Sequence, residues 1–445
     1  MLKILHLKMR RLTSFQIIIL GFSGVILIGA LLLMLPASSR AGVVTSFSDA
    51  LFTSTSAVCV TGLVVYDTAT YWSTFGQLII LLLIQIGGMG VITVAASFAI
   101  ISGKKISLMQ RSTMQEAISA PKVGGIVRLT GFIVKSTLII ELLGAAAMAP
   151  VLCKDYGFNG LWMALFHSIS AFCNAGFDLM GAKSPFSSLT GYAAEPVINL
   201  TIMLLIVVGG LGFLTWDDIR TNRLQLHKYR MQSKVILATT SLLLAVPAIY
   251  FYFFEFDSFA PAERIFASLF QSVTPRTAGF NTVDLTGLSE SGQSVMIALM
   301  LIGGSPGSTA GGMKTTTVAV LLATAVSTFF RKENTHFFNR RIDDDVVKNA
   351  VTILLMYLTL FFFGGLIISG VEGLPVLTCL FETASAVGTV GLSLGITPSL
   401  GTLSRIILIV LMFFGRVGGL TLIFAALSGK QKNVSKLPRE KITVG

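Results

Sequence analysis

The segment Ser56–Leu63 reads SAVCVTGL, and close variants of it recur three more times along the 445-residue chain. The other three are SAFCNAGF at 170–177, VTPRTAGF at 273–280 and SAVGTVGL at 385–392. Each contains a glycine at its seventh position, followed by a large apolar residue (Gly62, Gly176, Gly279 and Gly391). A unit that recurs four times at nearly even spacing predicts four copies of one supersecondary structure.

The composition indicates that most of the chain lies in a lipid bilayer. Hydrophobic residues make up 53% of the sequence and charged residues only 12%, with a mean hydropathy of +0.81. A soluble domain carries roughly 25% charged residues. The four cysteines have neither metal-ligand spacing nor a disulfide pattern, and are interpreted as small apolar residues (Cys59, Cys153, Cys173 and Cys379).

Apolar runs long enough to cross a bilayer predict eight transmembrane helices, at 14–36, 75–101, 126–150, 195–216, 233–254, 294–330, 348–370 and 403–427. Lysines and arginines gather at the N-terminus, within 104–128, 220–234 and 331–348, and within 430–441, and the alternate connections hold few. By the positive-inside rule these segments and both termini are cytoplasmic, in a multi-pass protein of the plasma membrane. The net charge of +12 therefore reflects topology, and no nucleic-acid partner is expected because no basic face is interleaved with aromatic residues.

The four outer connections each contain an apolar segment that is too short to span the bilayer. These segments are FSDALFTSTSAV from Phe47, GLWMALFHSISAF from Gly160, AERIFASLFQSV from Ala262 and LPVLTCLFETASAV from Leu374. They predict re-entrant helices, which require protein or water around the backbone that turns back at membrane depth. The predicted fold is an all-α polytopic membrane protein with four repeats of span, pore helix and span around a pseudo-fourfold pore. The predicted divisions are 1–12, 13–101 (repeat 1), 126–219 (repeat 2), 233–330 (repeat 3), 346–428 (repeat 4) and 429–445, the first and last being cytoplasmic.

The repeated glycines predict a cation site on the pseudo-fourfold axis. Glycine permits a backbone conformation with inward-facing carbonyls, and a ring of carbonyls replaces the hydration shell of a monovalent cation. The alternative is that these glycines only allow close helix packing. The predicted selectivity-filter residues are Val60, Thr61 and Gly62; Asn174, Ala175 and Gly176; Thr277, Ala278 and Gly279; and Thr389, Val390 and Gly391.

An aligned glycine pair, at equivalent positions, marks the second span of each repeat, at 87–88, 209–210, 303–304 and 418–419. In the third repeat the pair opens GGSPGSTAGGMKTTT, 303–317, which nearly matches a phosphate-binding loop over 307–315. Met313 interrupts that motif and no strand precedes it, so a nucleotide site is not expected. An unwound segment at membrane depth indicates a water-lined cavity. The predicted gate residues are Gly303, Gly304, Ser305, Pro306, Gly307, Ser308, Thr309, Ala310, Gly311, Gly312, Met313 and Lys314, together with Arg416.

Arg416 lies in the middle of the last apolar span. Because an arginine facing lipid there costs several kcal/mol, it should face the pore or a polar partner. It acts either as an electrostatic barrier and gate partner or as a structural arginine satisfied by carbonyls of 305–313, and the two roles are compatible. Asp178 and Asp284 either concentrate cations at the outer mouth or are solvated loop charges, and His167 is interpreted as a packing residue.

These features together resemble the Ktr/Trk/HKT superfamily of potassium transporters, over nearly the full length of the chain. The resemblance rests on the four repeats, the single filter glycines and the interrupted third repeat, and the short N-terminus is most like the KtrB-type membrane subunits. It implies potassium uptake, often stimulated by sodium, by a homodimer that sits on a cytosolic ring of KtrA-type nucleotide-binding subunits. It also implies K⁺ as the transported ion, Na⁺ as a possible second ion and no organic cofactor, and glycine at position 62 implies potassium selectivity.

Two other classes of protein are less consistent with these features. An alternating-access secondary transporter for sodium or another small solute also uses broken helices, but it is typically built from inverted repeats, whereas these four repeats share one orientation. A membrane enzyme is not expected, because no H-E-x-x-H motif or spaced Asp/His pair stands out.

Overall fold

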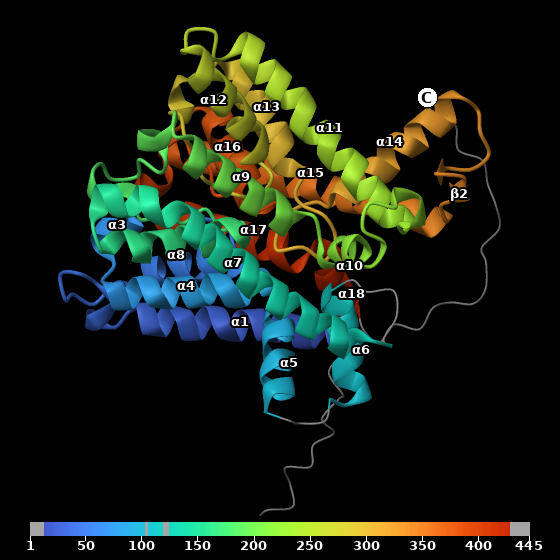
Figure 1. Cartoon of the computed structure of the whole chain (residues 1–445), viewed down its shortest axis with the longest axis horizontal. Helices are drawn as coiled ribbons and strands as arrows, with labels where there is room; N and C mark the ends of the chain where they lie inside the picture. The colour runs from blue at the N-terminus through green and yellow to red at the C-terminus, as the bar shows by residue number, and fades with distance from the viewer. Residues whose placement is uncertain (1–12, 103–105, 119–123, 428–445) are drawn as a thin grey trace, which may run out of the picture.

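The computed structural model describes residues 13–102, 106–118 and 124–427 (Figure 1). The predicted cytoplasmic ends, 1–12 and 429–445, lie outside this range, as do Lys104, Lys105 and Lys122, which contributed to the predicted orientation. Within the described part the fold is helical apart from one short hairpin, β1 (His336–Phe337) paired with β2 (Arg340–Arg341).

Each repeat consists of a long helix, a short helix and a second, interrupted helix. Repeat 1 contains α1 (Ser14–Leu33), α2 (Phe47–Cys59), α3 (Thr68–Tyr71), α4 (Thr74–Met89) and α5 (Val91–Ile101), followed by α6 (Leu108–Ile118). Repeat 2 contains α7 (Ile126–Tyr156), α8 (Asn159–Phe172), α9 (Pro196–Gly210) and α10 (Phe213–Asn222). Repeat 3 contains α11 (Met231–Phe254), α12 (Pro261–Val273), α13 (Glu290–Leu301) and α14 (Thr315–Phe329). Repeat 4 contains α15 (Asp344–Glu372), α16 (Val376–Gly388), α17 (Thr402–Val417) and α18 (Gly419–Leu427).

Short 3₁₀ turns connect these helices: η1 (Pro36–Ser38), η2 (Met180–Ala182), η3 (Thr190–Tyr192), η4 (Leu226–Lys228), η5 (Leu285–Gly287) and η6 (Thr397–Ser399). Local sequence explains where several helices begin. Thr13 and Gln16 form a capping box at the start of α1, and Ser46 accepts from the Asp49 N–H at the start of α2. The four predicted re-entrant segments are α2, α8, α12 and α16.

The second spans differ from the predicted continuous helices. In the described residues, four helices are long and apolar enough to cross a membrane, namely α1, α7, α11 and α15. Counting each bent pair as one span raises this number to six, because α4 and α5 meet at 93° and α9 and α10 at 97°. The bends fall at Gly90 and Gly212, whose φ angles of 86° and 90° an L-residue rarely adopts. Figure 1 shows α4 beside α1, with α5 leaving α4 at a steep angle.

A third glycine of the same kind, Gly418 with a φ of 87°, separates α17 from α18. The positive-φ glycines therefore align repeat 4 with repeats 1 and 2 at Gly418, Gly90 and Gly212. The predicted equivalence of the 418–419 pair with 87–88 and 209–210 is wrong by three residues, and Gly415 is the true counterpart of Gly87. Arg416 consequently occupies the place that Gly88 and Gly210 occupy in the first two repeats.

Packing contacts support this alignment. A Cβ atom at Gly87, Gly209 or Gly415 would lie less than 3.0 Å from the carbonyl oxygen of Val58, Phe172 or Val387, respectively. Each of those carbonyls precedes its repeat's predicted filter glycine by four residues. The second helix of each of these repeats therefore packs on the C-terminal end of the pore helix at a position that admits only glycine.

We predict that Gly415→Ala lowers the stability of the folded protein by about 1–3 kcal/mol, because backbone must move to accept the methyl group. Gly370→Ala is the matched control, since a Cβ there meets nothing within 4 Å on the exposed side of α15. Thermal unfolding in detergent measures both variants. Equal melting temperatures would contradict the proposed contact.

Candidate functional site

The four predicted filter glycines form a closed ring, defined here as Gly62, Gly176, Gly279 and Gly391. A Cβ on each would lie less than 3.0 Å from the carbonyl oxygen that precedes the ring glycine of the next repeat: Ala175 for Gly62, Ala278 for Gly176, Val390 for Gly279 and Thr61 for Gly391. The contacts run from repeat 1 through repeats 2, 3 and 4 and back to repeat 1. The structure thus brings together all four predicted segments around one point.

Each ring segment is defined here as the three residues that end at a ring glycine (60–62, 174–176, 277–279 and 389–391), and its backbone alternates in conformation. The residues two positions before the ring glycines have left-handed φ angles, 58° at Val60, 60° at Asn174, 64° at Thr277 and 53° at Thr389. The ring glycines also have positive φ angles, from 69° to 95°, whereas the residues between them do not. A left-handed conformation is costly for β-branched residues such as valine and threonine. Surrounding contacts must therefore hold these segments in place.

Hydroxyl groups of the pore helices provide part of that support. The N–H groups of Gly62 and Gly391 donate to Ser56 Oγ (3.0 Å) and Ser385 Oγ (2.9 Å). In repeat 2, Ser170 Oγ donates instead to the carbonyl oxygen of Phe177 (2.7 Å). These serines open three of the four repeated octapeptides, and sequence reasoning missed their role although the motif contained them.

Three threonine hydroxyls of the ring segments are buried and have no hydrogen-bond partner among the described residues, those of Thr61, Thr277 and Thr389. An unsatisfied buried hydroxyl costs about 1–3 kcal/mol. The Thr389 hydroxyl faces the interrupted segment of repeat 3, since a Cβ at Gly311 would contact its Oγ1. These oxygens are available to a dehydrated ion or to water.

A cavity of about 420 Å³, called here the outer cavity after the predicted orientation, is lined by all four ring glycines. Three carboxylates, those of Asp67, Asp178 and Asp284, also line it. Burial, with a smaller contribution from the Asp67 carboxylate, raises the pKa of Asp178 to about 7, even though the Met180 N–H donates to this carboxylate at 2.9 Å. No metal-binding group of three or more His, Cys, Asp or Glu side chains is present in the described residues.

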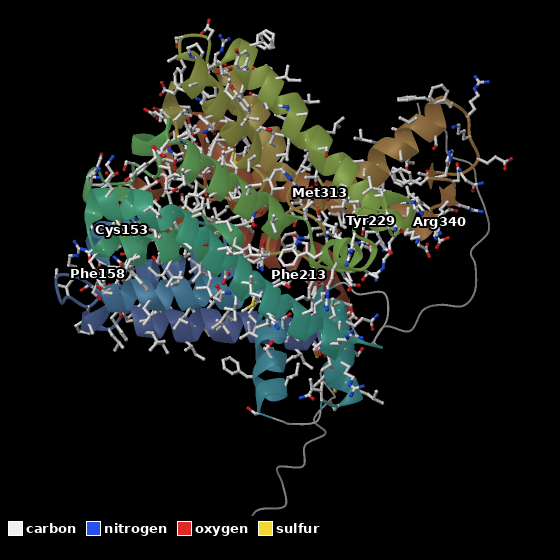
Figure 2. The ribbon with its side chains drawn as sticks, in the orientation of Figure 1. Cys153, Phe158, Phe213, Tyr229, Met313 and Arg340 are labelled. Atoms are coloured by element: carbon white, nitrogen blue, oxygen red, sulfur yellow. The ribbon has the colours of Figure 1, made fainter. Side chains whose placement is uncertain are left out.

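On the other side of the ring lies the interrupted segment, residues 302–314, between α13 and α14. Its two ends are paired, because the Gly303 N–H donates to the Met313 carbonyl at 2.7 Å. Its middle contacts other repeats, since the Ser305 N–H donates to Gly210 O (3.0 Å) and the Gly312 N–H donates to Gly415 O (3.1 Å). Figure 2 shows Met313 between Phe158 at one end of the helices and Arg340 at the other.

The interrupted segment is bonded directly to a ring segment. Thr309 Oγ1 is 2.9 Å from Asn174 Oδ1 and 3.1 Å from the Phe172 carbonyl oxygen. The Asn174 amide also donates to the carbonyl of Arg276, the residue directly before the next ring segment (3.3 Å). The link between Asn174 and Thr309 was not predicted, and residues 135 positions apart in sequence give no local signal for it.

Arg416 connects the interrupted segment to repeat 1. Its guanidinium donates to the carbonyl oxygens of Thr309 and Gly87, and to that of Gly88 at 3.0 Å. Lys314 donates to the carbonyls of Ala310 (2.8 Å) and Gly311 (3.3 Å) within its own segment. Both side chains line a second cavity, of about 170 Å³, which shares no lining residue with the outer cavity. The predicted carbonyl partner of Arg416 within 305–313 is thus present, and two further carbonyls come from α4.

Comparison with known proteins identifies a family and a solved structure to which this chain is similar. A model of the TrkH family, described as a cation transport protein, matches residues 5–436. The chain is 39% identical to the potassium/sodium uptake protein NtpJ of Enterococcus hirae, over 98% of each chain. It is also 39% identical to the Ktr system potassium uptake protein B of Bacillus subtilis, over 96% of each chain. The potassium transporter TrkH of Vibrio parahaemolyticus has the same fold, with a TM-score of 0.74 and 21% identity over 95% of this chain and 86% of that one.

The fold and the matches define a multi-pass membrane protein of the ion-transporter class, which is not an enzyme. The chain belongs to the TrkH family of cation transport proteins. The predicted superfamily and the predicted all-α fold are both confirmed.

Proposed function

We propose that this chain conducts potassium into the cell across the plasma membrane, with the ring segments as its selectivity filter. The observation that carries the proposal is the closed ring, in which four glycines pack against four carbonyls and leave no space for side chains. Carbonyl oxygens and free threonine hydroxyls suit a dehydrated monovalent cation. The pore helices α2, α8 and α16 end within four residues of their ring glycines, so their negative ends favour a cation there.

The interrupted segment acts as the gate in this proposal. It lies between two cavities that share no lining residue, and it is bonded on one side to Asn174 and on the other to Arg416. The positive charge of Arg416 repels a cation leaving the ring. Ion passage therefore requires the segment to move, which breaks the Thr309 contacts.

The transported ion and the partner proteins are inferred from the names of similar proteins. Two similar proteins are named for potassium uptake, and NtpJ is named for potassium and sodium, so K⁺ is the transported ion and Na⁺ a stimulating or accompanying one. The Ktr system name implies a multi-component complex. We infer a homodimer bound to a cytosolic KtrA-type nucleotide-binding ring, with both termini cytoplasmic and the basic segments 217–234 and 331–348 facing that ring.

An alternating-access mechanism for sodium or another small solute is disfavoured. Such a mechanism rocks one group of repeats against another. Here each ring glycine contacts the next repeat, so rocking would open the ring at two places.

Gly62→Ser is predicted to reduce the preference for K⁺ over Na⁺, because its side chain would meet the Ala175 carbonyl oxygen at 2.5 Å and displace it. We expect a loss of about tenfold, equivalent to about 1.4 kcal/mol of differential binding. Competing ⁸⁶Rb⁺ and ²²Na⁺ uptake into proteoliposomes measures the ratio.

The matched control is Gly42→Ser. Gly42 also has a positive φ, of 68°, but a Cβ there meets nothing within 4 Å. It therefore imposes similar backbone strain away from the ring, and its ion preference should equal that of the parent. An unchanged ratio in folded Gly62→Ser protein would contradict a filter at this position.

Thr309→Val is predicted to raise K⁺ flux about tenfold. The substitution keeps the side-chain volume but removes the hydroxyl that bonds Asn174 and Phe172, and the loss of about one net hydrogen bond favours the released gate. Ser308→Ala is the control, because among the described residues the Ser308 hydroxyl bonds only to the carbonyl of Ser305, within the segment itself (2.7 Å). Flux at or below the parent level in Thr309→Val would reject the gate.

External acid is predicted to lower K⁺ influx, with a midpoint near pH 7. The pKa of Asp178 is raised to about 7 by burial, so its carboxylate is charged above that pH and becomes neutral as pH falls through it. Neutralisation removes an attraction for cations at the outer mouth. Asp178→Asn should show low influx without this midpoint, whereas Asp284→Asn should keep it. Influx measured between pH 5.5 and 8.5 tests both, and an unchanged pH profile in Asp178→Asn would exclude this role.

A further inference from the structure

One position in the pore helices differs chemically among the four repeats. Nine residues before the ring glycine stand Thr53, His167, Phe270 and Glu382. His167 and Glu382 are fully buried. Neither makes an ion pair within the part of the chain that the structure describes. Burial of a polar or charged side chain is costly unless hydrogen bonds satisfy it. The hydrogen-bond partners of His167 and Glu382 therefore indicate what each side chain does.

Glu382 holds the segment that leaves the ring in repeat 4. Its carboxylate accepts from the Leu394 N–H (3.2 Å), the Ser393 hydroxyl (2.5 Å) and the Thr397 hydroxyl (2.8 Å). All three donors come from the outer segment that follows Gly391, and all three residues line the outer cavity. One side chain in α16 therefore fixes both that segment and one wall of the outer mouth.

His167 makes the equivalent contact in repeat 2. Its Nε2 accepts from the Leu179 N–H at 3.2 Å, while its Nδ1 donates to the Met163 carbonyl at 2.7 Å. This pair of bonds fixes the neutral tautomer with the proton on Nδ1. Leu179 and Leu394 each stand three residues after their ring glycine. The two buried polar side chains thus hold the same backbone N–H in repeats 2 and 4, which are not adjacent in the ring.

We propose that His167 and Glu382 are positioning residues that set the outer half of the ring and thereby its preference for K⁺ over Na⁺. The inference rests on the proposed function, since it assigns the specificity of the same site. Both side chains act through the backbone after the ring glycine and do not touch the ion. Phe270, which has no polar group, cannot supply this contact in repeat 3, and among the described residues this particular contact is made in repeats 2 and 4.

The test compares K⁺ and Na⁺ uptake into proteoliposomes for Glu382→Ala, Glu382→Gln and His167→Phe. We expect the K⁺/Na⁺ uptake ratio to fall about tenfold in Glu382→Ala and His167→Phe. Glu382→Gln should keep the parent ratio, because an amide oxygen still accepts from the Leu394 N–H. His167→Phe reproduces the residue that repeat 3 carries and keeps the core filled, so it carries the test if Glu382→Ala does not fold.

Glu372→Ala is the matched control. The Glu372 carboxylate accepts from the Gly401 N–H (2.9 Å) and the Ser404 hydroxyl in the same repeat, without contacting the ring segment. Its loss should lower the melting temperature and leave the uptake ratio unchanged. The inference is overturned if Glu382→Ala and His167→Phe keep the parent ratio, if Glu372→Ala lowers the ratio equally, or if Glu382→Gln behaves like Glu382→Ala. Absence of K⁺ uptake by the parent would overturn the proposed function as well.

Discussion

The contact of each ring glycine with a carbonyl oxygen of the next repeat is the constraint on which the structure depends. It forces four backbones to meet with no side chain between them, which requires positive φ at the glycine and left-handed φ two residues earlier. Such a backbone is strained, and it persists only where neighbouring groups fix it. The serine hydroxyls of the pore helices, together with His167 and Glu382, supply that support.

Close contacts between glycines and backbone carbonyls also occur below the ring. The second helix of repeats 1, 2 and 4 packs a glycine on the end of its pore helix and then turns three residues later at a positive-φ glycine. Repeat 3 replaces that turn with the interrupted segment, which lies beneath the ring and bonds to two other repeats, to repeat 2 through Gly210 and Asn174 and to repeat 4 through Gly415. Where the other repeats place a small residue, repeat 4 places Arg416, whose guanidinium reaches both the segment and α4.

The sequence predicted the features that depend on repetition and on hydropathy. Recurring glycines and short apolar segments located the ring and the four pore helices, and a glycine-rich interruption located the unwound segment. The bends at Gly90 and Gly212 were missed because apolar residues continue on both sides of them. Hydropathy does not indicate whether two consecutive apolar helices lie along the same axis. The alignment of repeat 4 was missed because its Gly-Gly pair at 418–419 has the same sequence as the pairs in the other repeats. The glycine that packs on the pore helix in repeat 4 is instead Gly415. Contacts such as Asn174 with Thr309 depend on the assembled fold and have no sequence signal.

Joining four repeats in one chain allows each to diverge while the ring stays closed. The ring itself needs only glycine and backbone, so it tolerates different residues in the layers behind and beneath it. Repeat 3 carries the unwound segment, repeat 4 the arginine that binds it, and repeats 2 and 4 the buried polar groups that hold the outer backbone. A symmetric assembly of identical subunits would need four unwound segments and four arginines at one axis, and the positive charges would repel one another in a medium of low dielectric. Divergence of the repeats therefore makes it possible to place one interrupted segment and one arginine beneath a nearly symmetric ring.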